Sequence, residues 1–317
     1  MTAAPRARVQ RRPVHGVLLL DKPLGLSSNQ ALQKAKWLLA AEKAGHTGTL
    51  DPLATGVLPL CFGAATKFSQ LQLDADKTYT TTLILGITTS TGDGEGQITS
   101  QQPVTCTVGQ VVETLDQFMG PIEQIPPMYS ALKHDGQPLY ALARQGKEVE
   151  RPARQVTIHE LELLDMQLQA SPPTLTLKVT CSKGTYIRTL AEDIGRALGC
   201  GAYVQTLRRV ATGDLTEEQC ISLETLEATP ANERTQLLQA ADTLLGKHLP
   251  IELEAPEAGK FLSGQRVKGA WPNTPQVRVY GTQPRALLGI GHIHSGELIS
   301  DRLLSPLEIQ HILEAQA

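Results

Sequence analysis

The chain has 317 residues and a net charge of −3, with 41% hydrophobic but only 4% aromatic residues. This length and apolar content predict one large domain plus a small one, with a sizeable buried core. No apolar run approaches the roughly 18 residues of a membrane span, and no signal-peptide core follows the N-terminal arginines. The five cysteines suggest no disulfide framework, so we expect a protein of the reduced cytoplasm.

Residues 1–12 are predicted to form a disordered basic arm. A short arm of this kind can contact a nucleic-acid backbone or can simply be solvated, and the sequence leaves both interpretations open. The basic residues of the arm are Arg6, Arg8, Arg11 and Arg12.

From residue 14 to residue 120, hydrophobic periodicity predicts strands and helices in mixed order. We expect strands over 14–20 and 79–87, a loop over 91–96, a helix over 107–119, and a further helix after the first strand. The helix after the first strand is expected to be capped by Ser27 or Ser28 and to have its apolar positions at Leu32, Ala35 and Leu39. The strand over 79–87 is expected to have one face made by Tyr79, Thr81, Leu83, Leu85 and Ile87. The helix over 107–119 is expected to point inward at Val108, Val111, Val112 and Leu115.

The next part of the chain predicts two more strands, over 156–168 and 175–181, and a helix over 187–198 that Gly199 ends. Between the helix over 107–119 and the strand over 156–168 lies a long segment with prolines, 125–154, which contains one short helical run. Excursions of this length are usually functional or disordered. Strands and helices that mix without strict βαβ order indicate an α+β fold.

Charge is distributed unevenly along the chain. The segment from Asp214 to Glu257 holds ten acidic residues and only two basic ones, and is expected to form acidic helices over 223–245. The rest of the chain is therefore basic on balance, which suits phosphate binding but also fits an ordinary solvated surface. The residues expected to form this basic patch are Lys178, Lys183, Arg188, Arg196, Arg208 and Arg209.

The amino-acid composition changes near Pro250. From residue 251 the chain is rich in glycine and contains three strand-like runs, 277–280, 287–293 and 297–304. We therefore expect a second, small β-rich domain at residues 251–317.

The segment from Gly45 to Lys67 contains a single acid, Asp51, between Leu50 and Pro52. A carboxylate followed by proline is a common start of a short helix, in which Asp51 would be the N-cap. The dense glycines around it favour a different interpretation, because they allow backbone to approach a ligand closely.

The start of this segment, GHTGTLDP, resembles the signature of the TruB family of pseudouridine synthases. Four further stretches agree: DKPLGLSSN at 21–29, KTY at 77–79, KGTYIRTLAEDIG at 183–195 and LRRVATG at 207–213. The resemblance covers nearly the whole chain except its first dozen residues. It implies a catalytic domain at 13–250 with a mixed, largely antiparallel sheet, an insert at 125–154 that closes over RNA, and a PUA-like β-barrel at 251–317.

The resemblance also implies a function. The chain would isomerise uridine 55 in the T loop of tRNAs to pseudouridine, by flipping the nucleotide out of its stack. Isomerisation needs no redox partner and no outside energy, so no cofactor is expected. The expected partner is the T arm of tRNA, with no membrane, no obligate protein partner and a monomeric chain.

The family motifs imply roles for individual residues. Asp51 is the expected nucleophile, attacking either C1′ of the ribose or C6 of the uracil, and the sequence does not choose between these routes. Without the resemblance, the tyrosines at 79 and 186 would as readily fill the core, and His46 would as readily bond to backbone or to Asp51. The further residues implied are Arg188 as the cationic partner of Asp51, Tyr79 beneath the uracil and moving the C5 proton, Tyr186 and Leu207 pressing on the base, His46 entering the vacated space, and Lys22, Lys67 and Lys77 in structural or phosphate-binding roles.

Two other classes of protein are considered. A non-catalytic RNA-binding protein would use the same fold with Asp51 only capping a helix. A small-molecule hydrolase or phosphotransferase is disfavoured, because the chain has no D-x-D pair in the motif region and no phosphate-binding loop. A metal site is not expected either: the five cysteines form no C-x-x-C pair, and His292 and His294 have no third ligand nearby in the sequence.

Overall fold

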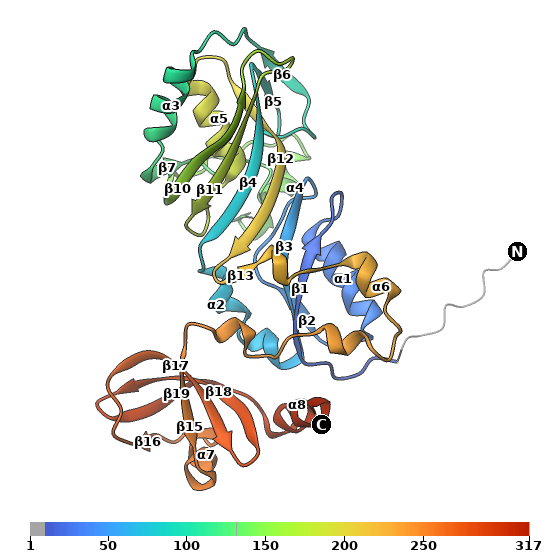
Figure 1. The fold of residues 1–317 in the computed structure, drawn as a ribbon, viewed down its shortest axis with the longest axis vertical. Coiled ribbons are helices and arrows are strands. Elements are labelled where there is room, and N and C mark those ends of the chain that lie inside the picture. Colours follow the sequence, from blue (N-terminus) through green and yellow to red (C-terminus); the bar gives the residue numbers. More distant parts are fainter. Residues whose placement is uncertain (1–9, 131, 317) are drawn as a thin grey trace, which may run out of the picture.

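The computed structural model describes residues 10–130 and 132–316. Figure 1 shows an elongated molecule in which a long twisted sheet occupies most of the length and a smaller curled sheet lies at one end. The first part contains β1 (Gly16–Lys22), α1 (Ser28–Leu38), β2 (Ala44–His46), β3 (Ala54–Phe62), α2 (Ser69–Leu73), β4 (Lys77–Leu85), β5 (Ile87–Thr89), β6 (Ile98–Gln101), α3 (Val108–Asp116), β7 (Gly120–Gln124), β8 (Lys133–His134), β9 (Gln137–Pro138), α4 (Leu139–Ala143), β10 (Arg154–Gln167), β11 (Thr174–Cys181), α5 (Ile187–Ala197), β12 (Ala202–Thr212), β13 (Leu215–Thr216), β14 (Ile221–Ser222) and α6 (Leu223–Ala228). The end of the chain contains β15 (Leu249–Leu253), α7 (Ala255–Leu262), β16 (Val267–Lys268), β17 (Thr274–Thr282), β18 (Arg285–His294), β19 (Glu297–Leu303) and α8 (Pro306–Gln316).

The main sheet has ten strands in the order β14-β1-β3-β12-β4-β11-β10-β7, with β13 on β12 and β2 on β3. Only the β1–β14 and β12–β3 pairs are parallel, and the other pairs are antiparallel. The α+β fold with a mixed, largely antiparallel sheet is therefore confirmed. Strand β12, which comes late in the chain, lies between the early strands β3 and β4.

Both faces of β1 are buried, which explains its unbroken apolar run. Leu18 and Leu20 pack on the side of α1 and α6, while Val17 and Leu19 pack on the other side against the segment that leads to the C-terminal sheet. A strand covered on both faces needs no polar alternation.

In the other half of the sheet, α3 and α5 pack against the strands β4 and β11. Leu83 on β4 and Leu177 on β11 share one core with Ile187 and Ile194 of α5 and Val111 of α3. This core fixes α5 against the sheet, and α5 begins at the edge of the candidate site described below.

The predicted helix over 107–119 is confirmed in position by α3, but the prediction that Val108 and Val112 point inward is wrong. They are 57% and 46% exposed, whereas Val111 and Leu115 are buried. The reason is that the short helix α3 contacts the rest of the fold along one narrow stripe. The strand predicted over 79–87 ends at Leu85, and the residue expected at its end belongs instead to β5, part of a separate hairpin with β6.

The acidic segment forms less helix than expected. Only α6 is an α-helix between residues 223 and 245, and it is followed by two short 3₁₀ turns, Arg234–Leu237 and Thr243–Leu245. Pro230 lies just beyond α6 and cannot continue it.

The structure describes the last residues of the arm predicted over 1–12, from residue 10 onward. Arg12 donates its backbone N–H to the Ala40 carbonyl at 2.8 Å, and the Arg11 side chain donates to the Ala41 carbonyl at 3.0 Å. For these two arginines the prediction of disorder is wrong, because the chain here pairs with the segment after α1. Arg6 and Arg8 lie outside the described residues.

The C-terminal part is a five-stranded sheet in the order β15-β17-β18-β19-β16. It curls into a half-barrel rather than closing, since β15 and β16 remain its two edges among the described residues. Lys67 of the first part forms an ion pair with Glu308 of α8 at 2.6 Å, and the Tyr280 hydroxyl donates to Asp242 at 2.6 Å. Within the described residues, no helix is long and apolar enough to cross a membrane.

Candidate active site

Asp51 lies in a tight turn before β3 and does not cap a helix. The backbone N–H of Ala54 donates to the Asp51 carbonyl at 3.0 Å, and the chain enters β3 directly from this turn. The helix-cap interpretation of Asp51 is therefore wrong. Gly48 has a φ of +76°, a conformation that other residues rarely adopt, and it lets the loop bend back over the sheet.

Two contacts from the DKPLGLSSN segment hold the loop on either side of Asp51. The Ser28 hydroxyl accepts a hydrogen bond from the Leu50 N–H at 2.8 Å and donates one to the Leu50 carbonyl at 3.1 Å, and all three groups are buried. On the other side, the Gly25 N–H donates to the Pro52 carbonyl at 2.8 Å. The backbone around Asp51 is thus fixed to the first turn of α1.

Arg188 bridges two carboxylates. One of its terminal nitrogens lies 2.8 Å from Oδ2 of Asp51, and the other lies 3.4 Å from Oδ2 of Asp93. The side chains of Arg188 and Asp93 are 7% and 4% exposed, whereas that of Asp51 is 42% exposed. The guanidinium therefore stabilises the negative charge of a carboxylate that a ligand can reach.

Further contacts fix the position of Arg188. Its guanidinium donates to the Tyr129 carbonyl at 2.7 Å and to the Thr91 carbonyl at 3.1 Å. The backbone that precedes it is held by the buried amide of Gln124, which exchanges two hydrogen bonds with the backbone of Tyr186, at 3.0 and 3.2 Å. Because α5 starts at the next residue, the start of this helix and the ion pair are positioned together.

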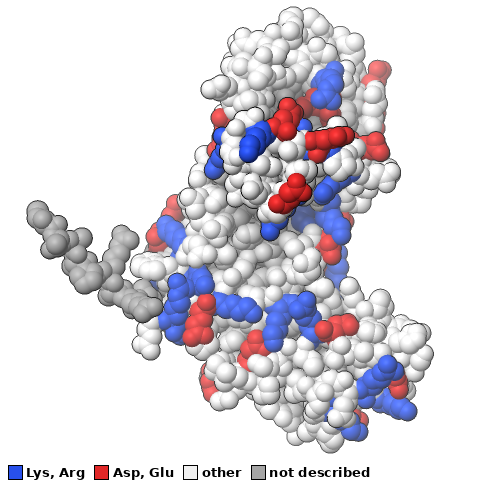
Figure 2. Space-filling view, turned by 180° about the vertical axis from the view of Figure 1, so that it is seen from behind, with Lys and Arg blue, Asp and Glu red and all other residues white. Residues whose placement is uncertain are grey.

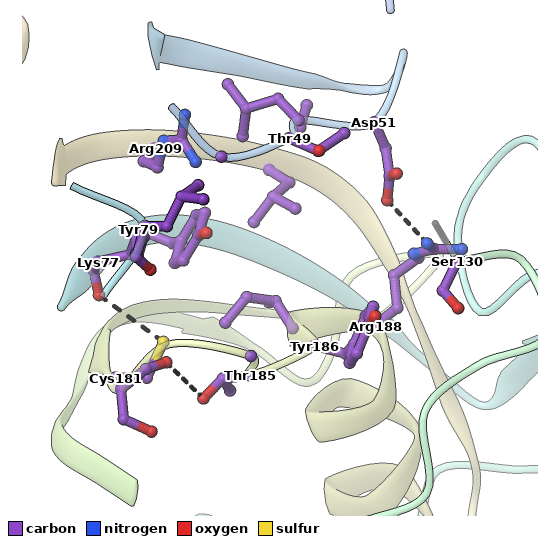
Figure 3. A pocket seen from close by; sticks show the side chains of 18 of the residues that line it. Thr49, Asp51, Lys77, Tyr79, Ser130, Cys181, Thr185, Tyr186, Arg188 and Arg209 are labelled. Carbon is purple, nitrogen blue, oxygen red and sulfur yellow. Dashed lines mark hydrogen bonds and ion pairs between the residues drawn. The ribbon is translucent and has the colours of Figure 1, made fainter. Parts of the chain in front are cut away.

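Asp51 and Arg188 lie at one side of a cavity of about 340 Å³, shown in Figure 3. A cavity of this size is within the usual range for small-molecule and nucleotide sites. Tyr79, Tyr186 and Leu207 also line it, so five of the six predicted site residues meet in one cavity. They come from the loop before β3 and from β4, the start of α5 and β12.

The two tyrosines of the cavity are neutral phenols at neutral pH. Burial raises the pKa of Tyr79, while the nearby Arg209 guanidinium opposes this rise. Burial also raises the pKa of Tyr186. Both rings can therefore stack on an uncharged base, and either phenol would need help to lose its proton.

His46, the sixth predicted site residue, is not part of the cavity wall. It ends β2, and its Nδ1 lies 3.0 Å from the Gly48 carbonyl, so it bonds to backbone and not to Asp51. Burial lowers the pKa of His46, which favours the neutral ring.

The three lysines of the family motifs make structural contacts. The Lys22 ammonium is fully buried and donates to the carbonyls of Pro23 and Leu26, and burial lowers its pKa to about 8. The Lys77 ammonium donates to carbonyls of the α2 segment, and burial likewise lowers its pKa to about 8. Lys67 pairs with Glu308 of α8, so all three lysines make contacts that stabilise the fold.

The residues of the expected basic patch do not form a free cationic surface, which favours the second of the two interpretations left open, an ordinary surface of paired charges. Figure 2 shows Lys and Arg interspersed with Asp and Glu across one face of the molecule. Neighbouring strands and loops supply acids that the local sequence does not show. The pairs are Lys178 with Glu160 and Glu162, Lys183 with Asp74, Arg188 with Asp51 and Asp93, Arg196 with Asp193, and Arg208 with Asp21 and Glu217, while Arg209 is buried.

Sequence reasoning missed Asp93 and Gln124, and it gave Ser28 no role beyond a possible helix cap. Asp93 belongs to the glycine-rich loop over 91–96, and no local pattern shows that it would be buried against Arg188. Among the described residues, no group of three or more His, Cys, Asp or Glu side chains could hold a metal ion.

Comparison with known protein families matches three models along the chain. Residues 36–187 match the TruB family pseudouridylate synthase N-terminal domain. Residues 188–249 match the tRNA pseudouridylate synthase B C-terminal domain, and residues 250–304 match the pseudouridine synthase II TruB C-terminal model.

Curated relatives align over nearly the whole chain. A tRNA pseudouridine synthase B from Verminephrobacter eiseniae is 60% identical over 319 aligned residues, covering 100% of this chain and 96% of the relative. A protein of the same name from Cupriavidus taiwanensis is 55% identical, with 94% and 96% covered.

Solved structures share the fold at low sequence identity. The protein in a Cbf5-Nop10-Gar1 complex superposes with a TM-score of 0.68 at 24% identity, covering 95% of this chain and 87% of that one. A chain from an H/ACA RNP bound to a substrate RNA containing 2′-deoxyuridine gives a TM-score of 0.67 at 21% identity, with 92% and 86% covered. At these identities the likeness establishes the fold alone.

Proposed function

The chain belongs to the TruB family of pseudouridylate synthases, and we propose on this basis that it isomerises uridine 55 in the T loop of tRNAs, with Asp51 as the nucleophile. The coarser assignment, an isomerase that makes pseudouridine in tRNA, follows from family membership and from relatives that align along nearly the whole chain. The position in the tRNA and the mechanism are the proposed parts.

The observation that carries the proposal is the Asp51–Arg188 ion pair on the wall of the cavity. The Asp51 side chain is partly exposed and lines the cavity, while its partner Arg188 and the second carboxylate, Asp93, are buried. A nucleophile needs this combination of stabilised charge and open access.

The reaction breaks the bond between C1′ and N1, turns the base and joins C5 to C1′. The Asp51 carboxylate can attack C1′ or C6, and both routes need the nucleotide held against the same wall. We assign Tyr79 and Leu207 the role of holding the base, which is supported by their position: both line the cavity, from the paired strands β4 and β12. Tyr186 closes the side next to Arg188.

A base can reach this cavity only after it leaves its stack, so the tRNA nucleotide must be flipped out. We propose that His46 enters the space that the base vacates. Burial lowers the pKa of His46 and so favours the neutral ring, which is bonded to the Gly48 carbonyl, and Gly48 lines the cavity. An uncharged imidazole at this position can stack against bases.

In the last step the proton on C5 must leave, and we propose that Tyr79 accepts it. Its phenol is neutral in the free protein, so it must lose its own proton before it can take up another.

We propose that the insert 125–154 and the C-terminal sheet hold the tRNA. The insert already reaches the site, since the carbonyl of Tyr129 accepts a hydrogen bond from Arg188. The proposed domains are 13–250 for catalysis and 251–317 for RNA binding, with a monomeric chain acting on the T arm. We place this activity in the cytoplasm, where tRNA is used.

The test is tritium release from tRNA carrying 5-³H-uridine, measured with wild type and Asp51→Asn side by side. Asp51→Asn keeps the shape of the side chain and removes its charge. We expect release by wild type at the T loop and no release by the variant, with tRNA affinity within about threefold of wild type as the control for folding.

Release by Asp51→Asn at the wild-type rate would rule out Asp51 as the nucleophile. Release from uridines outside the T loop, with none from position 55, would refute the proposed target. No release by folded, tRNA-binding wild type would leave a non-catalytic RNA-binding protein.

A further inference from the structure

Arg209 is a buried guanidinium without a carboxylate partner. It is 1% exposed, and its Nε donates to the Val57 carbonyl at 2.7 Å. Its Nη2 is buried and has no hydrogen-bond partner within residues 10–130 and 132–316, where no acid lies within ion-pair distance of it either. Burying an unpaired cation is costly, so a compensating role is expected.

The strand register places this guanidinium beside Tyr79. Arg209 on β12 is directly opposite Tyr79 on the antiparallel strand β4. Residues opposite each other in such a pair point to the same face with their Cβ atoms about 5 Å apart. Both side chains line the cavity, and Figure 3 shows them together on the side away from Asp51 and Arg188.

The other charged or titratable groups around Tyr79 do not favour its ionised form. Cys181 on β11 and Asp51 on the loop before β3 both act to raise the pKa of Tyr79, in the same direction as burial. Arg209 acts in the opposite direction. Lys77, two residues earlier on β4, has its ammonium bonded to carbonyls of the α2 segment.

We propose that Arg209 is a positioning residue for the isomerisation, which faces the Tyr79 phenol and stabilises the negative charge on its oxygen when that oxygen removes the C5 proton. The inference rests on the role proposed above for Tyr79. Arg209 borders the cavity beside the tyrosine but is only 1% exposed, so we assign its effect to Tyr79 and not to a bond with substrate.

Tyr79 first gives its own proton to water, and the phenolate is stabilised by Arg209. After C5 has bonded to C1′, the C5–H bond breaks and its electron pair forms the C5–C6 double bond. The pair of the C6–N1 double bond moves to N1, which takes a proton from water, while the C5 proton goes to the Tyr79 oxygen. Tyr79 ends as a phenol, and substrate and product have the same composition.

The experiment compares single-turnover rates on tRNA with hydrogen or deuterium at C5 of the target uridine. Arg209→Gln removes the charge and keeps donors for the Val57 carbonyl, and Arg209→Lys keeps a charge. We expect Arg209→Gln to be slower by about 10- to 100-fold at neutral pH, with a larger deuterium isotope effect than wild type and a deficit that shrinks as pH rises. Arg209→Lys should recover part of the rate.

Two controls separate this role from a structural one. The isotope effect is a ratio within one protein preparation, so it does not depend on the fraction that is folded. Arg208→Gln is the matched control, since Arg208 is the adjacent residue on β12 but pairs with Asp21 and Glu217. It should keep the isotope effect of wild type.

The double variant Arg209→Gln/Tyr79→Phe tests whether the two residues act as a unit. We expect it to be no slower than Tyr79→Phe alone. An unchanged isotope effect in Arg209→Gln, with Tyr79→Phe impaired, would overturn the role of Arg209 and leave that of Tyr79. A wild-type rate and isotope effect in Tyr79→Phe would instead refute the proposed role of Tyr79 itself.

Discussion

Ser28→Ala should lower both the stability of the protein and the rate of its chemical step. The Ser28 hydroxyl makes two hydrogen bonds to the backbone of Leu50, at 2.8 and 3.1 Å, and it is 1% exposed. Alanine leaves a buried N–H and a buried carbonyl without this partner, and water cannot enter to replace it. Leaving a buried polar group unsatisfied costs about 1–3 kcal/mol, so we expect a loss of about 2 kcal/mol in the free energy of unfolding.

The effect on rate follows from the neighbouring residue. Leu50 directly precedes Asp51, so a backbone released from Ser28 can shift the carboxylate relative to Arg188. A misplacement of about 1 Å can cost about 100-fold in rate. We therefore expect a single-turnover rate about 10- to 100-fold below wild type, with tRNA affinity nearly unchanged.

Urea unfolding gives the stability, and single-turnover tritium release gives the rate. Ser27→Ala is the matched control, because the Ser27 hydroxyl caps α1 through the Gln30 N–H at 3.2 Å and the hydrogen bonds to Leu50 come from Ser28. Loss of a cap costs about 1 kcal/mol, so this variant should lose some stability but keep the rate. Equal rates for Ser28→Ala and Ser27→Ala would refute the idea that Ser28 positions Asp51.

Three further outcomes are expected. Asp93→Asn should lower the single-turnover rate by about 100-fold or more, because Arg188 loses its buried carboxylate; a change below about threefold would show that Asp51 alone is sufficient to hold the guanidinium. Gly56→Ala should destabilise the fold by about 3 kcal/mol or more in urea unfolding, since its φ is +98° and a Cβ would lie 2.2 Å from a β12 carbonyl oxygen. Gly45→Ala is the control and should remain near wild type, because no atom beyond the adjacent residues lies within 4 Å of the added carbon. Burial lowers the pKa of Lys77 to about 8, so between pH 8 and 10 the unfolded chain binds a proton that the folded chain has lost. The free energy of unfolding of wild type should therefore rise by about 1–3 kcal/mol relative to that of Lys77→Met as pH rises through this window. A difference between the two proteins that does not change with pH would contradict the burial argument.

Local patterns in the sequence were sufficient for much of the fold. The spacing of Leu32 and Ala35 predicts α1, and both are buried in its core. The motif around Asp51 predicts a site through its resemblance to the TruB signature, whereas its local spacing alone fits a helix cap as well. Patterns of this kind depend on neighbours in the sequence, which the sequence shows directly.

The ion pairs could not be predicted in the same way. Lys178 looks like a free cation in the sequence, yet the register of β10 against β11 places Glu160 and Glu162 beside it. Asp93 is buried against Arg188 by the packing of a distant loop on α5. The charge state of a surface depends on strand pairing and loop packing, which no local periodicity specifies.

The position of β12 between β3 and β4 has a consequence for the synthesis of the protein. Leu207 and Arg209 complete the cavity from β12, so residues up to Thr212 must leave the ribosome before the site can exist. Until then, β3 and β4 have a gap between them and expose the edges that β12 will pair. A nascent chain therefore cannot modify RNA until β12 has been synthesised. A chaperone that binds unpaired strand edges would bind in this gap.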